Sequence, residues 1–177
     1  RIYRLPCISG KDSMKNDAVI DGQKISVPPT ILFSILGNHK DVRKAVTSDF
    51  KNEGDIIYLL GETHQELGAS ELAFMLRDER GGGIGGIVPQ IDADRNISLY
   101  RAIVSAMDKS LISSAHDCSD GGLAVSLAEC CFGSDTGAII EIKSLWENCQ
   151  DLDSWGALFG ESLGRILVSI NPKNKID

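Results

Sequence analysis

The feature that most constrains the fold is the stretch 113–131, in which a short polar cluster runs through two glycines into an apolar pattern. Leu123, Leu127 and Cys131 recur every four residues, so their side chains share one face of a helix. We therefore predict a helix that starts near Leu123 and packs this face against a core. The polar cluster is then held at the helix start.

The residues just before this helix have two interpretations. Gly121 and Gly122 carry no Cβ, so an anion can approach the unpaired N–H groups of the helix start. The carboxylates of Asp117 and Asp120 would repel a bare phosphate. This interpretation therefore requires a divalent cation such as Mg²⁺ that bridges the carboxylates and the anion. In the alternative interpretation, Ser119 or Asp120 is simply the N-cap, which stabilises a helix by about 1 kcal/mol.

Composition and charge narrow the class of protein. The 177 residues are 42% hydrophobic and 24% charged, which suits one globular domain with part of a neighbouring one. The net charge is −7 and the basic residues are scattered, so we expect neither nucleic acid nor an anionic membrane as a partner. No apolar run approaches the 18 residues of a transmembrane candidate.

The five cysteines form an odd set without a CxxC pair, and Cys130 and Cys131 are adjacent. Neighbouring cysteines are not easily bridged, so we expect reduced thiols and a cytoplasmic location. The chain begins with Arg1, which suggests a fragment or a processed chain.

Hydrophobic periodicity predicts four strands and four helical segments. The apolar run 31–37 is continuous, so we expect a strand that is buried on both faces, and we place the domain boundary after it. Helix starts are signalled by a capping box from Thr63 to Glu66, with Ser70 as an alternative, and by Asp92 or Asp94. The strands are predicted at 31–37, 56–60, 138–142 and 165–170, and the helices at 71–80, 92–109, 123–131 and within 145–159.

The same spacing predicts which side chains point inward. In the helix 71–80 they are Leu72, Met75 and Leu76, and in the helix 92–109 they are Ile97, Tyr100, Val104 and Met107. Trp146 and Trp155 are expected as core or interface anchors, and Gly160-Glu161-Ser162 as a turn.

Residues 9–13, SGKDS, form a second candidate for phosphate binding. Lys11 can contact a phosphate and Ser13 can donate a hydrogen bond. The run lacks the glycine that opens a P-loop, and a short polar segment of this kind is usually a solvated turn. We therefore expect a turn here.

The glycine-rich run 81–87 formally satisfies G-x-G-x-x-G. A dinucleotide site requires a strand before this motif and a helix after it. Here a predicted helix precedes the run and Val88-Pro89 follows it, so we interpret it as a connecting loop.

Several longer motifs occur together in a fixed order and cover nearly the whole chain. They are SGKDSM at 9–14, PPT at 28–30, GDIIYLLGET at 54–63, ELGASE at 66–71, SAHDCSDGGLAVSLAE at 114–129 and LFGESLGRILVS at 158–169. In this order they resemble the last part of the phosphoribosylformylglycinamidine synthases, a family of the aminoimidazole ribonucleotide synthetase superfamily.

The resemblance implies an ATP-dependent carbon–nitrogen ligase of purine biosynthesis. In this family ATP phosphorylates the amide oxygen of formylglycinamide ribonucleotide, and ammonia from glutamine displaces the phosphate. It further implies ATP or ADP and Mg²⁺ as cofactors. The implied partners are the remainder of the synthase, a glutaminase domain or subunit, and a small-molecule substrate. The alternatives are a structural domain without its own ligand, or another ATP-dependent member of the superfamily.

The resemblance also implies the fold. It is α/β (α+β), with a mixed β-sheet covered by helices, preceded by a remnant of an N-terminal sheet domain. Residues 1–45 correspond to the end of the second N-terminal, ATP-binding sheet domain. Residues 46–177 correspond to the second C-terminal domain, which we expect to be truncated at its end.

Site residues follow by position. Asp117 corresponds to a magnesium ligand, in a half of the long family forms that retains a nucleotide without turning it over. We expect no catalytic residue here, because the catalytic histidines of the family lie in the first half, and the fragment alone should be inactive. The nucleotide- or substrate-binding residues that the resemblance implies are Gly10, Lys11, Ser13, Ser119, Gly121 and Gly122.

Overall fold

The computed structural model divides into two units, Arg1–Val42 and Arg43–Asp177. It describes residues 3–5, 9–13, 17–26, 30–77, 85–143 and 151–175. The predicted boundary lies at 45/46, and the assignment of the two parts to the family's domains stays a prediction. Each unit is described by itself.

The first unit contains two antiparallel strand pairs. Asp21 and Gly22 both have positive φ and form the two-residue turn of the second pair, as in a type I′ hairpin. The expected turn at residues 9–13 is wrong, because this segment forms a strand against the apolar run that follows it. The pairs are β1 (Ser9–Ser13) with β4 (Thr30–Ser34), and β2 (Ala18–Ile20) with β3 (Gln23–Ile25).

The apolar run 31–37 is not buried on both faces as predicted. Strand β4 ends at Ser34, and Phe33 and Leu36 are 66% and 77% exposed. Continuous apolarity predicts burial only where layers cover both faces of a strand. Among the described residues of this unit β4 belongs to a two-stranded sheet, which explains the exposure.

The second unit is built on a sheet whose described strands have the order β5-β7-β6. Strand β7 (Ile166–Ile170) lies in the middle and pairs antiparallel with β5 (Ile56–Leu60) and with β6 (Ser114–Asp117). The predicted strands at 56–60 and 165–170 are therefore confirmed. The last of the described strands along the chain thus lies at the centre of the sheet.

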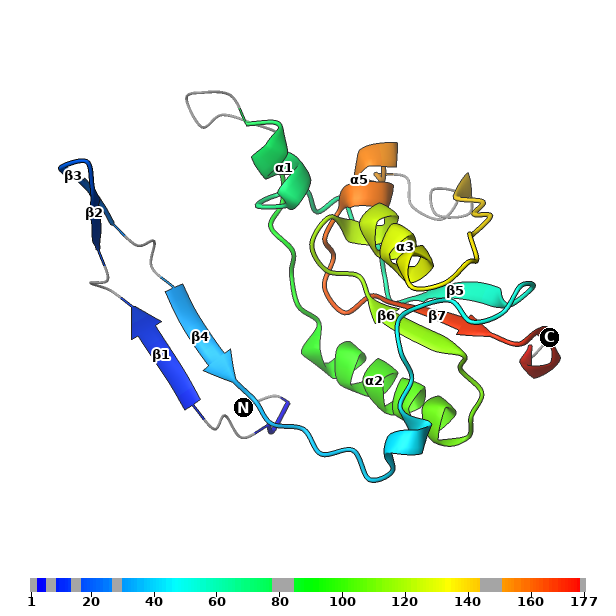
Figure 1. Ribbon diagram of the computed structural model, residues 1–177. Coiled ribbons are helices and arrows are strands. Elements are labelled where there is room, and N and C mark those ends of the chain that lie inside the picture. Colours follow the sequence, from blue (N-terminus) through cyan, green and yellow to red (C-terminus); the bar gives the residue numbers. More distant parts are fainter. Residues whose placement is uncertain are drawn as a thin grey trace. The chain divides into compact units, whose positions relative to one another are not determined.

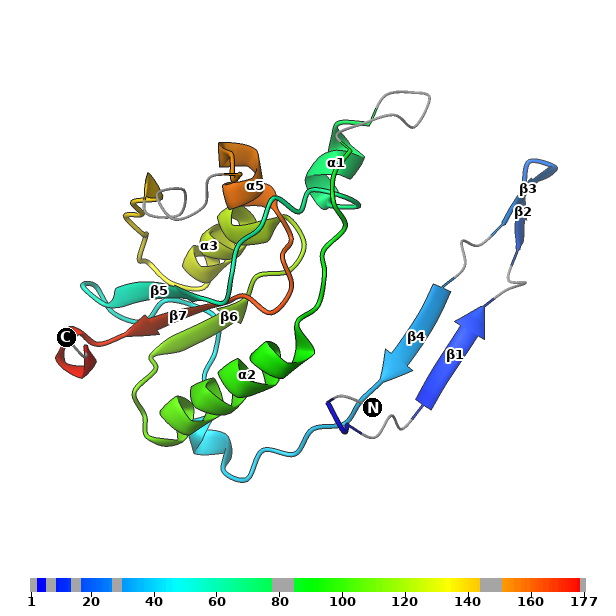
Figure 2. The same ribbon diagram turned by 180° about the vertical axis from the view of Figure 1, so that it is seen from behind.

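Helices lie on both sides of this sheet. Figures 1 and 2 show α2 (Ala93–Asp108) on one side and α3 (Gly122–Phe132) with α5 (Ser154–Phe159) on the other. The unit also contains the short helix α1 (Glu71–Met75) and the 3₁₀ turn η2 (Pro172–Asn174), while η1 (Val42–Lys44) adjoins the boundary between the units. The predicted α/β class, with a sheet covered by helices, is confirmed.

The core of the second unit lies between α3 and the sheet. Leu123 and Cys130 of α3 pack with Leu167 of β7, together with Phe50 and Cys118. This is the face that the four-residue spacing in 123–131 predicts. Successive side chains of a strand point to opposite faces of its sheet. In β6 the side chains of His116 and Asp117 therefore lie on opposite faces, one covered by α3 with the core and the other by α2.

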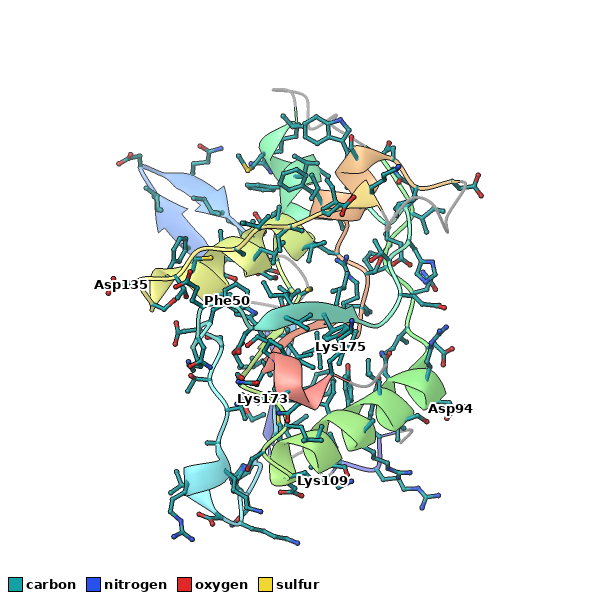
Figure 3. The ribbon with its side chains drawn as sticks, turned by 90° about the vertical axis from the view of Figure 1, so that its right-hand side faces the viewer. Phe50, Asp94, Lys109, Asp135, Lys173 and Lys175 are labelled. Carbon is teal, nitrogen blue, oxygen red and sulfur yellow. The ribbon has the colours of Figure 1, made fainter. Side chains whose placement is uncertain are left out.

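Helix α2 begins as predicted but turns a different face inward. Asp92 is the N-cap, and its Oδ1 accepts a hydrogen bond from the backbone N–H of Arg95 at 3.0 Å. The sequence-based face included Val104, which is 57% exposed, whereas its neighbour Ile103 is 5% exposed. The prediction for Val104 is therefore wrong. The inward face is rotated relative to the predicted one, because its buried residues are Ala93, Asn96 and Ile103, while Ile97, Tyr100 and Met107 of the predicted face are half-buried. Figure 3 labels Asp94 and Lys109 at the two ends of this helix.

This rotation predicts unequal effects for two neighbouring substitutions. Ile103→Ala should lower the free energy of unfolding by about 3 kcal/mol, because it leaves a cavity in a packed interior. Val104→Ala should change it by less than about 0.5 kcal/mol, as is usual for surface positions. Urea unfolding of both variants measures the difference, and equal losses would show that the inward face is assigned incorrectly.

The helix after β5 starts at the alternative position. Ser70 is the N-cap of α1, and its Oγ accepts a hydrogen bond from the backbone N–H of Ala73 at 3.2 Å. The capping box from Thr63 to Glu66 is wrong, since no helix begins there. Met75 and Leu76, which we expected to point inward, are 76% and 51% exposed, because the regular helix ends at Met75.

The predicted strand at 138–142 does not form. Ile139 is fully exposed, and residues 138–141 line a groove of about 840 Å³ beside β5. Strand-prone side chains form a strand only when the backbone pairs with a neighbour, and this segment makes no ladder with β5.

Some predictions lie wholly or partly outside the described residues. They concern Trp146, Cys7, Cys149, residues 28–29 and most of the loop 81–87. The described part of that loop, residues 85–87, is irregular, as expected. Trp155 is half exposed and lies 5.8 Å from the ring of Phe159. None of the described helices combines the length and apolarity needed to cross a membrane.

The cysteines of the described part, Cys118, Cys130 and Cys131, are free thiols. Burial, with the neighbouring Cys131 as the next cause, raises the pKa of Cys130 to about 11. Because the thiolate is the reactive form, Cys130 is inert at neutral pH.

Alkylation of the folded protein with iodoacetamide at pH 8 should therefore modify the half-buried Cys131 before Cys130. Peptide mass spectrometry measures both sites, with the urea-unfolded chain as the control in which both react. Equal rates in the folded protein would contradict the assigned burial of Cys130.

Candidate functional site

The candidate site begins where β6 ends at Asp117 and the chain turns into α3. Asp117 is paired with Ile166 in the sheet, and the backbone N–H of Cys118 donates to the carbonyl of Arg165 at 3.0 Å. The Asp117 side chain is 75% exposed, and the hydroxyl of Ser119 donates to its Oδ2. A fixed strand end thus presents one accessible carboxylate with a hydroxyl bonded to it.

Neither Ser119 nor Asp120 caps helix α3, so that interpretation is wrong. The N-cap is Gly121, in the left-handed region with φ of 78°, and it makes no side-chain capping bond. A carboxylate from another segment instead bonds the N–H of the N-cap residue, as the glutamate of a capping box does. The backbone N–H of Gly121 donates to Oε1 of Glu161 at 2.9 Å.

The two glycines are explained by backbone conformation and close packing. A Cβ on Gly122 would lie 2.5 Å from the carbonyl oxygen of Gly160, and φ of Gly122 is +68°. A Cβ on Gly121 would lie 2.4 Å from Cγ2 of Val125. The backbone N–H groups of both glycines already donate within the protein, that of Gly122 to the carbonyl of Ser119 at 3.1 Å. Direct contact of these glycines with a ligand stays a prediction.

Gly122→Ala should lower the free energy of unfolding by more than about 2 kcal/mol, because it combines a positive φ with a clash against backbone. Gly137→Ala is the matched control, since a Cβ there meets nothing within 4 Å. Thermal unfolding of both variants checks the expectation. Similar melting temperatures for the two would mean that Gly122 does not pack against residues 158–160.

Asp117 lies in a cleft of about 510 Å³, which we call the Asp117 cleft. Its lining combines acidic and polar side chains with the apolar Pro89 and Leu163 and with Tyr100 of α2. The lining residues are Pro89, Tyr100, Asp117, Cys118, Ser119, Asp120, Glu161, Leu163, Gly164, Arg165 and Ile166. A ligand with one polar and one apolar end matches this lining.

Arg165 is the buried cation of the cleft, with 1% of its surface exposed. Its Nε donates to the carbonyl of Ser162 at 3.2 Å, its Nη1 to Oγ1 of Thr63 at 3.3 Å, and its Nη2 to the carbonyl of Gly160. Burial lowers the pKa of Arg165, and the carboxylate of Glu66 is among the groups that oppose this shift. The guanidinium therefore joins the segment after β5 to the loop before β7.

Glu66 is a second buried charged group in the same region. Its Oε1 accepts from the backbone N–H of Gln90 at 2.9 Å, while Oε2 has no hydrogen-bond partner among the described residues. The carbonyl of Glu66 accepts from the N–H of Glu161 at 3.1 Å. Glu66 thus connects the segment that carries Pro89 with the loop that carries Glu161.

A magnesium ion fits this site only in part. Within the described ranges, no group of three His, Cys, Asp or Glu side chains has the geometry to hold a metal. Protein-bound Mg²⁺ often takes one or two carboxylates and completes its shell with phosphate oxygens and water. The exposed Asp117, with Asp120 lining the same cleft, matches that pattern. His116 is not among the residues that line the cleft, and its ring lies between two carboxylates, with Nδ1 3.9 Å from Oδ1 of Asp117 and Nε2 3.4 Å from Oε2 of Glu129.

The predicted site residues fall into two groups. Asp117, Ser119 and the two glycines come together within six residues of the second unit. Gly10, Lys11 and Ser13 belong to strand β1 of the first unit. Pattern reasoning missed Glu161, Arg165 and Glu66. The signals in the sequence are the places of these residues in the motifs ELGASE and LFGESLGRILVS and the charged Arg165 directly before the apolar strand ILVSI.

Comparison with known proteins identifies the family. The model of the family "AIR synthase related protein, C-terminal domain" matches residues 52–177. The chain belongs to this family. The match includes the strands of the central sheet, the polar cluster at the start of α3 and the loop of Arg165.

The chain is also similar to a much longer curated protein. The chain is 40% identical over 151 residues to the phosphoribosylformylglycinamidine synthase subunit PurL of Thermobifida fusca. The match covers 85% of this chain and 18% of that protein. The chain therefore spans less than one fifth of the length of this relative.

Solved structures show the same fold. PurL of Thermotoga maritima complexed with FGAR matches with a TM-score of 0.63 and 21% identity, over 75% of this chain and 22% of that one. The complex of that protein with AMPPCP matches with a TM-score of 0.55 and 19% identity, over 81% and 20%. At these identities the likeness concerns the fold.

Proposed function

We propose that this chain is part of a phosphoribosylformylglycinamidine synthase, to which it contributes a nucleotide- and Mg²⁺-binding edge at the Asp117 cleft. The observation that carries the proposal is the 40% identity to PurL over most of the chain, together with the exposed Asp117 in a cleft of matching polarity. The whole enzyme would convert FGAR, ATP and glutamine-derived ammonia to the amidine, ADP and phosphate.

The chemistry assigns a limited role to this chain. Phosphorylation of an amide oxygen turns a poor leaving group into a good one, and Mg²⁺ offsets the phosphate charge. Asp117 would supply one carboxylate to the cation, and Ser119, whose hydroxyl bonds Asp117, would orient it. No residue of the cleft is proposed as catalytic. In this proposal the chain retains a nucleotide, and the reaction takes place elsewhere in the enzyme.

The first unit is proposed to take part in binding in the whole enzyme as well. Gly10, Lys11 and Ser13 lie on β1 and are proposed to face the nucleotide or the substrate in the whole enzyme. The proposed partners are the remainder of the synthase and a glutaminase domain or subunit. The unbridged Cys118, Cys130 and Cys131 support a cytoplasmic location.

Asp117→Asn should weaken the binding of ADP with Mg²⁺ by about tenfold or more, because the amide loses the charge that holds the cation. The melting temperature of the ligand-free protein should barely change, since the side chain is 75% exposed. Isothermal titration calorimetry of the full-length protein measures binding, and the exposed Asp135→Asn is the control.

The same experiment separates the rival functions. A purely structural domain would bind no ADP. Asp117→Asn would then show an effect, if it has one, in the melting temperature of the ligand-free protein alone. Another ATP-dependent member of the superfamily would bind ADP but would not consume FGAR. Release of ADP from ATP in the presence of FGAR and ammonia distinguishes that case.

A further inference from the structure

One carboxylate of the loop between α5 and β7 connects two helix starts. Oε1 of Glu161 accepts a hydrogen bond from the backbone N–H of Glu71, the first residue of α1, at 2.9 Å. It also accepts from the N–H of Gly121, the N-cap of α3, at 2.9 Å. Glu161 belongs to the lining of the Asp117 cleft as well. A single side chain therefore bonds two backbone segments that are 50 residues apart in sequence.

The position of this carboxylate is itself determined by buried groups. Arg165 donates to the carbonyls of Gly160 and Ser162, the two neighbours of Glu161. The backbone N–H of Glu161 donates to the carbonyl of Glu66 at 3.1 Å. The backbone is thus held on both sides of Glu161 and at the residue itself, which fixes the point from which its side chain reaches the two N–H groups.

At the turn that Glu161 contacts, other side chains bond carbonyls and a carboxylate but not the N–H of Gly121: the hydroxyl of Ser126 donates to the carbonyls of Asp117 and Gly122 at 3.3 and 3.0 Å. Gly121 has no side chain and its helix start has no local capping bond. Hydrogen bonds to an ionised carboxylate are stronger than neutral ones, and Glu161 gives the N–H of the N-cap residue the acceptor that a glutamate gives it in a capping box. Ser119 and Asp120 directly precede Gly121, whose N–H bonds Glu161. The hydroxyl of Ser119 in turn bonds the carboxylate of Asp117.

We propose that Glu161 is a positioning residue of the Asp117 cleft. It holds Gly121, and through it the turn of Ser119, in the arrangement that receives a nucleotide with its cation. The carboxylate occupies the N–H of Gly121, so phosphate oxygens reach the cleft through the cation at Asp117 and not through that N–H. This inference rests on the proposed function and adds a residue that does not itself touch the reacting atoms.

Three variants of the full-length protein test this role. Glu161→Ala removes the acceptor, and Glu161→Gln keeps an acceptor oxygen without the charge. Glu53→Ala is the control, because this exposed residue lies in a turn before β5 that lines the β5 groove and not the Asp117 cleft. The readouts are amide hydrogen exchange at Gly121 and Glu71 without ligand, and the dissociation constant for ADP with Mg²⁺. Should Glu161→Ala fail to fold, Glu161→Asp, which retracts the carboxylate by one methylene, replaces it.

Glu161→Ala should speed exchange at both amides by about tenfold or more and weaken ADP binding by a similar factor. Glu161→Gln should recover most of both, and Glu53→Ala should change neither. The proposal is overturned if exchange at Gly121 is unchanged, or if exchange rises while ADP binds as in the wild type. If the wild type itself binds no ADP, the proposed function fails, and amide exchange alone then decides whether Glu161 holds the turn.

Discussion

The buried guanidinium of Arg165 is the interaction on which the second unit depends. It bonds two carbonyls of the loop before β7 and the hydroxyl of Thr63, which follows β5. Strands β5 and β7 are therefore linked through these neighbouring loops as well as through the hydrogen bonds of their ladder. A buried cation is costly unless its donors are satisfied, and here backbone carbonyls satisfy them. Removal of any one acceptor would leave a charged donor without a partner in the interior.

Glycines, which have no side chain, allow further close contacts between the loops around Arg165. Gly122 lies against the carbonyl of Gly160, and a Cβ on Gly68 would lie 2.5 Å from the carbonyl of Gly86. Each contact brings together backbone segments that are far apart in the sequence. With Glu66 and Glu161 bonding between the same segments, the cleft is a junction of three loops whose geometry is largely set by backbone contacts.

Sequence reasoning succeeded where the information is local. The ends of α2, the strands β5 and β7 and the apolar face of α3 follow from spacing and capping residues within a few positions. It failed where burial depends on a partner: Val104 is exposed, residues 138–142 form no strand, and Phe33 and Leu36 of the run 31–37 are exposed. At the site, Asp117 and Ser119 were found from one motif, while Glu161 was interpreted only as part of a turn.

The amino-acid sequence by itself determined the family, the order of most elements and the position of an acidic cluster before a glycine-started helix, because these depend on neighbours along the chain. Only the tertiary structure decided which group caps that helix and why two glycines stand there. The carboxylate of Glu161 lies 40 residues away from Gly121 in sequence. No local pattern records a hydrogen bond or a close backbone contact that forms only when distant loops are packed together.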